Sequence, residues 1–266
     1  MTYMIMNERP NMTLYKRIKS IFTLTMHLAI DIGNSALKFA LFEGVQMMEK
    51  GNDIAALTTL LSSGRTSISA AIMASVADSA PTIDLLRKFN IPLTILSHQT
   101  PVPIRNLYQT PETLGTDRLT LAVAADRIFA CAPTLVIAVG TCITYNFVEQ
   151  GAFVGGAISP GITMRFQALH HYTAKLPLID WTAYQGRVYQ GLTGGDSQDS
   201  IISGVLNGVI QEVEGTIEQY KLRYSGLRVA VTGGDMPFLV KNLKNDIFAR
   251  PGMVLEGLNY ILLEHA

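Results

Sequence analysis

The sequence predicts an α/β protein with two related domains, and three observations support this. Apolar segments typical of strands alternate with helical patterns along the whole chain, as in layered α/β folds. The length of 266 residues suits one large domain or two of ordinary size, and 48% hydrophobic against 16% charged residues is enough for a well-filled core. A segment near the start of the chain also recurs in its second half.

The recurring segment begins at Leu28 and again at Leu135, and each copy predicts a hairpin with a Gly turn between two apolar strands. Gly33 matches Gly140, and Asn34 matches Thr141, at a constant offset of 107 positions. This offset is too long for a solenoid repeat, whose period is about 20–50 residues. We therefore expect domains over 26–133 and 134–266, although hairpins of this pattern also arise by chance.

The remaining elements follow from periodicity and turn residues. Strands are expected at 68–76, 91–96, 134–139, 153–158 and 227–231, and helices at 81–89, 117–130, from 161, 200–224 and 255–263, with a Pro-rich loop over 97–114.

Composition excludes several classes of function. Lys plus Arg and Asp plus Glu balance at 21 each without a basic run, so no surface for nucleic acid is expected. The only cysteines, Cys131 and Cys142, make no disulfide framework, which favours a reducing, cytoplasmic compartment. No apolar run reaches the roughly 20 residues of a membrane span. Residues 1–25 are expected to be a disordered leader or a product of start-codon choice.

The first hairpin carries a candidate phosphate site. Asp31 ends a buried strand, and the turn Gly33-Asn34-Ser35 offers backbone N–H groups and two polar side chains. Asp31 is suited to holding Mg²⁺ through water, and Lys38 on the next strand to offsetting charge. Asp-x-Gly-Asn also forms ordinary hairpin turns, so the motif alone is weak.

The second half supplies matching pieces. Gly140-Thr141 repeats the first turn, and Thr232-Gly233-Gly234 lies between a strand and a helix. Opposed Gly turns of this kind describe a nucleotide cleft between two domains, as in actin-like ATPases and sugar kinases.

The ordered set of motifs resembles the type III pantothenate kinases from residue 28 to the C-terminus. The matching pieces are Asp-x-Gly-Asn-Ser at 31–35, Tyr-x-x-Pro at 108–111, Gly-x-Asp-Arg at 115–118, Gly-Thr at 140–141, Gly-Gly-Ala-Ile-Ser-Pro-Gly at 155–161, Leu-Pro at 176–177, Ser-Gly at 203–204 and Thr-Gly-Gly at 232–234. Each is weak alone, but their order is specific.

The resemblance implies two actin-like (ribonuclease H-like) domains that bind ATP with Mg²⁺, and a homodimer that completes the pantothenate pocket. The expected activity is ATP-dependent phosphorylation of pantothenate, the first step of coenzyme A biosynthesis. The ATP-binding positions would be Asp31, Ile32, Gly33, Asn34, Ser35, Ala36, Leu37, Lys38 and Thr141. The substrate-binding positions would be Tyr108, Gly115, Thr116, Asp117, Arg118 and Ser197, where the family usually has Thr.

Asp117 matches the general base of the family, and Arg118 suits the carboxylate or amide oxygens of the substrate or, alternatively, a phosphate. Taken without the resemblance, an Asp-Arg pair at a helix start is a helix cap with a surface ion-pair partner.

Two departures from the family concern a monovalent cation, K⁺ or NH₄⁺. The usual Asp ligand is replaced by Ala138, and a second family acid by Asn146. The loss of charge is either compensated by neighbouring carbonyls or by Asn146, or it weakens the enzyme. Two alternative functions therefore stay open, namely another actin-like small-molecule kinase and a non-catalytic regulator that binds nucleotide or pantothenate.

Overall fold

The computed structural model describes residues 26–33, 36–64 and 67–265, which form two compact units. The first unit comprises residues 26–128 and 252–265, and the second comprises 129–251. The predicted leader at 1–25 lies outside the described residues. One boundary at 133/134 was expected from the sequence, whereas the compact units divide at 128/129 and the C-terminal segment from residue 252 packs in the first unit.

The sheet of the first unit has the strand order β3-β2-β1-β4-β5. β1 pairs antiparallel with β2, and β2 with β3, whereas β4 runs parallel to β1 and β5 parallel to β4. The strands are β1 (Met26–Ile32), β2 (Leu37–Glu43), β3 (Gln46–Gly51), β4 (Ile68–Ser75) and β5 (Leu93–Ile95).

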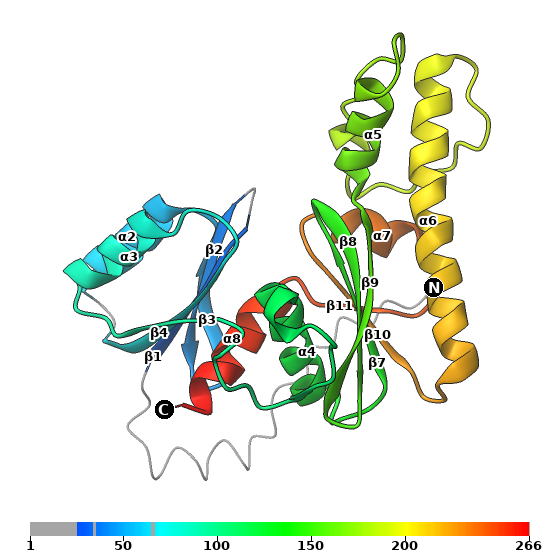
Figure 1. Cartoon of the computed structure of the whole chain (residues 1–266). Coiled ribbons are helices and arrows are strands. Elements are labelled where there is room, and N and C mark those ends of the chain that lie inside the picture. Colours follow the sequence, from blue (N-terminus) through cyan, green and yellow to red (C-terminus); the bar gives the residue numbers. More distant parts are fainter. Residues whose placement is uncertain (1–25, 34–35, 65–66, 266) are drawn as a thin grey trace. The chain divides into compact units, whose positions relative to one another are not determined.

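Helices cover both faces of this sheet (Figure 1). They are α2 (Ile54–Ser62) and α3 (Ala80–Lys88) on one face, and α4 (Thr116–Ile128) and α8 (Met253–Leu263) on the other. The buried side chains Leu28, Ile30, Leu57 and Leu86 join the strands to α2 and α3. The predicted loop between β5 and α4 contains only the short strand β6 (Arg105–Asn106) and a 3-10 turn at Pro111–Thr113.

Close packing explains why α8 joins the first unit. A side chain at Gly257 would collide with the main-chain oxygen of Thr120, so the glycine lets α8 lie directly against α4. Asn259 on the same helix donates a hydrogen bond of 2.7 Å to the carbonyl of Gly44 in the β2–β3 turn. These contacts connect segments more than a hundred residues apart, which no local pattern in the sequence reveals.

The second unit repeats this topology. Its strands take the order β11-β10-β7-β8-β9, with β7, β8 and β9 antiparallel and β10 and β11 parallel to β7. The strands are β7 (Thr134–Val139), β8 (Cys142–Glu149), β9 (Ala152–Pro160), β10 (Arg228–Thr232) and β11 (Phe248–Ala249). The internal similarity seen in the sequence is therefore a repeated ribonuclease H-like fold, and the explanation by chance is wrong.

The helices of the second unit are α5 (Ile162–His171), α6 (Ser197–Arg223) and α7 (Met236–Asn242), with a 3-10 turn at Thr182–Tyr184. α6 buries Ile202, Leu206, Val209 and Val213 against the sheet, at the spacing of three and four residues that keeps one helix face inward. α5 and the first turns of α6 extend beyond the sheet (Figure 1). None of the helices in the described ranges has the length and apolarity needed to cross a membrane.

Candidate nucleotide and substrate site

The turn between β1 and β2 carries the first group of predicted ATP-binding residues. Asp31 is the penultimate residue of β1 and pairs in register with Lys38 on β2. The backbone N–H of Gly33 donates to the carbonyl of Ala36 at 3.1 Å, which closes the turn. Asn34 and Ser35 lie outside the described residues. The predicted motif thus occupies a hairpin turn at the end of a buried strand, as the sequence indicated.

Asp31 is an acid in an unfavourable environment. Burial raises its pKa to about 6; the charge of Lys38 opposes this rise, and the charge of Asp117 adds to it. The charge of Asp117 thus acts on Asp31, although the two residues are far apart in the sequence. A carboxylate that burial destabilises gains from a nearby cation, so Asp31 suits a position beside a divalent metal ion.

Asp117 lies in the first turn of α4, where the helix begins at Thr116. Its Oδ1 atom lies 2.5 Å from the position that a Cβ atom on Gly115 would occupy. The glycine of the Gly-x-Asp-Arg motif therefore leaves room for the Asp117 carboxylate to fold back over it. An acid in the first turn of a helix is also stabilised by the helix dipole.

Arg118 and Tyr108, both expected at the substrate site, contact each other. The guanidinium carbon of Arg118 lies 5.6 Å from the centre of the Tyr108 ring, a cation–π geometry. Only 5% of Arg118 is exposed, so the alternative of a surface ion-pair residue is wrong. Buried against an aromatic ring, the planar guanidinium has a restricted orientation, which suits it to fix an anionic or amide group.

In the second unit, the Gly140-Thr141 turn joins β7 to β8 and is held from two sides. The N–H of Gly140 donates to the carbonyl of Cys142 at 3.0 Å, and the N–H of Gly161 donates to the carbonyl of Thr141 at 3.0 Å. A side chain at Gly161 would collide with the carbonyl oxygen of Gly140. The predicted Pro160-Gly161 motif therefore lies against the predicted phosphate turn.

The Thr232-Gly233-Gly234 motif also packs beside the Gly140-Thr141 turn. Gly233 has φ +100°, which favours glycine, and a side chain there would collide with the backbone of Val139 just before the turn. The N–H of Asp235 donates to the carbonyl of Val139 at 3.1 Å. Two glycine motifs from distant parts of the sequence thus pack against the Gly140-Thr141 turn, and Thr141 remains exposed there.

The two departures from the family pattern lie on neighbouring strands. Ala138, two residues before Gly140, corresponds to Asp31 in the first unit and pairs in register with Thr144. Asn146 is fully buried, and its amide nitrogen donates to the Thr144 hydroxyl at 3.0 Å and to the Val136 carbonyl at 3.3 Å. The Asn146 side chain is therefore part of the hydrogen bonding within the sheet.

Ser197 is the first residue of α6 and is exposed. It lines a groove of about 950 Å³ that lies between α5 and the first turns of α6, together with Arg165, Asp196 and Gly204. Below the groove, the Ser203 hydroxyl donates to the carbonyl of Leu192 at 2.7 Å. Sequence reasoning placed Ser197 only by resemblance and gave no indication of the groove.

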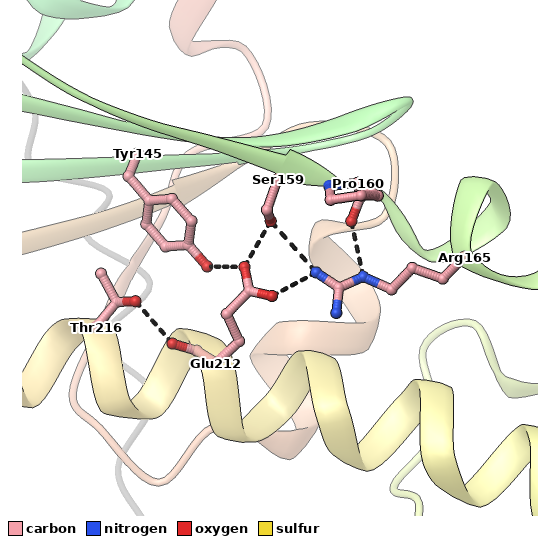
Figure 2. A network of polar contacts seen from close by, with 6 residues as sticks. All are labelled: Tyr145, Ser159, Pro160, Arg165, Glu212 and Thr216. Atoms are coloured by element: carbon pink, nitrogen blue, oxygen red, sulfur yellow. Dashed lines mark hydrogen bonds and ion pairs between the residues drawn. The ribbon is translucent and has the colours of Figure 1, made fainter. Parts of the chain in front are cut away.

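Sequence reasoning also missed a polar network in the second unit. Figure 2 shows the Glu212 carboxylate on α6 facing Tyr145 of β8, Ser159 of β9 and Arg165 of α5. These residues come from four separate elements, and no motif or spacing in the sequence connects them.

Two ribonuclease H-like units, each with a glycine turn after its first strand, define the actin-like class of nucleotide-binding proteins. A solved structure of a Baf family protein from Campylobacter jejuni has this fold, with a TM-score of 0.55 and 19% sequence identity over 90% of this chain and 98% of that one.

Sequence comparisons give the particular family. The sequence model of type III pantothenate kinases matches residues 27–219. The chain is 42% identical over 241 residues to a type III pantothenate kinase of Bacteroides fragilis, covering 89% of this chain and 97% of the relative. It is 38% identical over 239 residues to one of Flavobacterium johnsoniae, covering 88% and 96%. The chain belongs to the type III pantothenate kinase family, which confirms the resemblance seen in the sequence.

Proposed function

We propose that this chain transfers the γ-phosphate of ATP to the primary hydroxyl of pantothenate, forming 4′-phosphopantothenate in the first step of coenzyme A biosynthesis. Family membership supports the reaction, and one observation supports its site. Asp117, the acid of the Gly-x-Asp-Arg motif, acts electrostatically on the half-buried Asp31 and adds to the rise that burial causes in the pKa of Asp31.

The proposed mechanism assigns a role to each motif. Phosphoryl transfer passes through a loose transition state, so catalysis rests on positioning and on stabilisation of charge. Asp117 orients the attacking hydroxyl and accepts its proton, a role worth on the order of 10²–10⁴ in rate. The turn at Gly33 and the exposed Thr141 are the proposed phosphate contacts.

The proposed divalent-ion position is Asp31, which would hold Mg²⁺ through water. When bound, Mg²⁺ supplies positive charge that offsets the phosphate oxygens. Lys38, the partner of Asp31 across the hairpin, contributes a second positive charge.

The acceptor end of the site is assigned to Tyr108, Gly115, Thr116, Arg118 and Ser197. The buried guanidinium of Arg118, stacked on Tyr108, supports a contact with the carboxylate or amide oxygens of pantothenate. Ser197 retains the hydroxyl of the usual Thr and lies on an exposed groove, which supports the proposal of a homodimer whose partner chain approaches this region.

Dependence on a monovalent cation is proposed to be weak. K⁺ and NH₄⁺ need oxygen ligands, and Ala138 offers only a methyl group at the usual Asp position. Asn146 is engaged within the sheet. Only neutral carbonyl ligands would remain, and affinity for an ion falls as ligand charge is lost. We further propose a cytoplasmic location, which the two free cysteines support.

A second candidate function, a nucleotide- or pantothenate-binding regulator without turnover, is favoured only by the loss of acids at Ala138 and Asn146. A panel of acceptors with labelled ATP and Mg²⁺ separates the two. We expect label in 4′-phosphopantothenate and none on sugars or acetate. Binding of ATP and pantothenate without labelled product would favour the regulator.

A further inference from the structure

We propose that Glu212 and Arg165 are positioning residues for ATP, because they hold the segment that supports the Gly140-Thr141 turn. The proposal rests on the proposed contact between Thr141 and phosphate. Neither residue belongs to a motif of the nucleotide site, and neither is assigned to touch substrate.

The network is centred on the Glu212 carboxylate (Figure 2). Its Oε1 atom accepts hydrogen bonds from the Tyr145 hydroxyl at 2.8 Å and the Ser159 hydroxyl at 2.5 Å. Its Oε2 atom forms an ion pair with Arg165. One turn further along α6, the Thr216 hydroxyl donates to the main-chain carbonyl of Glu212 at 2.7 Å.

Arg165 carries the constraint from Glu212 to the phosphate turn. Its Nε atom donates to the carbonyl of Pro160 at 2.8 Å, and its Nη2 atom donates to the Ser159 hydroxyl at 3.3 Å. The next residue, Gly161, donates its N–H to the carbonyl of Thr141 at 3.0 Å. A rotation of the Pro160 peptide would turn this N–H away, so the orientation of Arg165 controls the support of Thr141.

Low solvent exposure of Arg165 and Glu212 restricts the orientation of the Arg165 side chain. The side chains of Arg165 and Glu212 are only 22% and 29% exposed, so each is poorly hydrated and depends on the other. Burial acts to raise the pKa of Glu212, but the hydrogen bonds from Ser159, Arg165 and Tyr145 outweigh it and lower the pKa. Glu212 is therefore ionised at neutral pH and accepts all its hydrogen bonds.

A purely structural role, in which the network only attaches α6 to the sheet, requires a matched control. Glu214 lies on the same helix and also attaches it to a distant segment, because its carboxylate accepts hydrogen bonds from the backbone N–H groups of Lys244 and Asn245. These hydrogen bonds lead to the 244–245 loop. Glu214→Gln thus reports the cost of loosening α6 alone.

The experiment compares Glu212→Gln with Glu214→Gln in the full chain. The glutamine amide cannot accept from Arg165 and both hydroxyls, so the Pro160 carbonyl loses its fixed partner. We expect Glu212→Gln to raise the Kd and KM for ATP by about tenfold, with the KM for pantothenate changed less than twofold. Glu214→Gln should lower Tm without raising the Kd for ATP, and Glu212→Asp should recover part of the loss.

A double-mutant cycle with Thr141→Val tests whether Glu212 affects ATP binding through Thr141. If Glu212 acts through Thr141, Glu212→Gln should raise the Kd for ATP less than about threefold in the Thr141→Val background. Additive effects, or equal ATP binding by Glu212→Gln and the wild type, would overturn the proposal while leaving the kinase function intact. A wild-type chain that binds no ATP overturns the proposed function and this proposal together.

A milder variant keeps the test valid where Glu212→Gln does not fold. Tyr145→Phe removes one hydrogen bond to the carboxylate and keeps the buried ring. It should raise the Kd for ATP by about threefold, and an unchanged Kd would count against the proposal.

Discussion

Asp31→Asn is expected to stabilise the protein while removing a residue that the reaction needs. Burial raises the pKa of Asp31 from 3.8 to about 6. In the unfolded chain the carboxyl has its ordinary pKa, so between about pH 4 and pH 6 the folded state binds the proton and the unfolded state does not. Stability therefore falls as pH rises through this window, and the loss is complete above about pH 6.

The size of the pKa shift of Asp31 determines the expected change in the free energy of unfolding. A rise of roughly two pKa units corresponds to about 3 kcal/mol of destabilisation at neutral pH. Asp31 is only partly buried and solvent screens its charge, so we expect about 1–3 kcal/mol. Because Asn cannot ionise, the Asp31→Asn variant should not carry this destabilisation. Its Tm should exceed that of the wild type by about 3–10 °C at pH 7.5, and the difference should shrink towards pH 4.5.

The assay is thermal unfolding of the free protein without nucleotide or Mg²⁺, from pH 4.5 to 8. Asp53→Ala is the matched control, because the Asp53 carboxylate caps α2 through a 2.7 Å hydrogen bond from the N–H of Ala56. Its loss should lower stability by about 1 kcal/mol. If Asp31→Asn also lowered Tm at pH 7.5, the Asp31 carboxylate would be well compensated in the free protein, and the reasoning from its burial would be refuted.

Three further predictions concern other residues of the proposed site. Gly115→Ala should lower kcat by about tenfold or more, because the new methyl group displaces the Asp117 carboxylate; unchanged kcat in a steady-state assay would contradict this. Ala138→Asp should give a saturable K⁺ response that the wild type lacks, measured at constant ionic strength with Na⁺ as control; a wild type that saturates at low K⁺ has another anchor. The chain should form a homodimer with Tyr108 or Ser197 near the partner chain. Light scattering should give the mass of a dimer, and a fully active monomer would refute this.

Much of the fold could be predicted from local pattern. The strand 134–139 was expected within the bounds that β7 has, because its run of apolar residues ends at a glycine turn. The edge strand β3 was not predicted, since Gln46–Gly51 is largely exposed and lacks apolar alternation. α2 was also missed, although Asp53 supplies a capping signal and Leu57 and Leu61 are buried four residues apart.

Some features of the candidate site could likewise be predicted from the sequence, and others could not. The glycine turns were readable because glycine marks backbone positions that a side chain would block, as at Gly161 and Gly233. The proximity of Asp31 to Asp117 depends on how α4 packs beside the sheet, which the sequence does not reveal. The Glu212 network could not be predicted from the sequence, because its residues follow no regular spacing and come together only in the folded chain.

The central claim, that Asp117 is the base of a working kinase, is tested most directly by turnover of Asp117→Asn. The measurement is a coupled assay with pantothenate, ATP and Mg²⁺, combined with calorimetric ATP binding on the same samples. The account predicts measurable wild-type turnover, a loss of roughly 10²-fold or more in the variant, and a Kd for ATP within about twofold of the wild type. Near-normal turnover of Asp117→Asn, or wild-type binding without turnover, would contradict it.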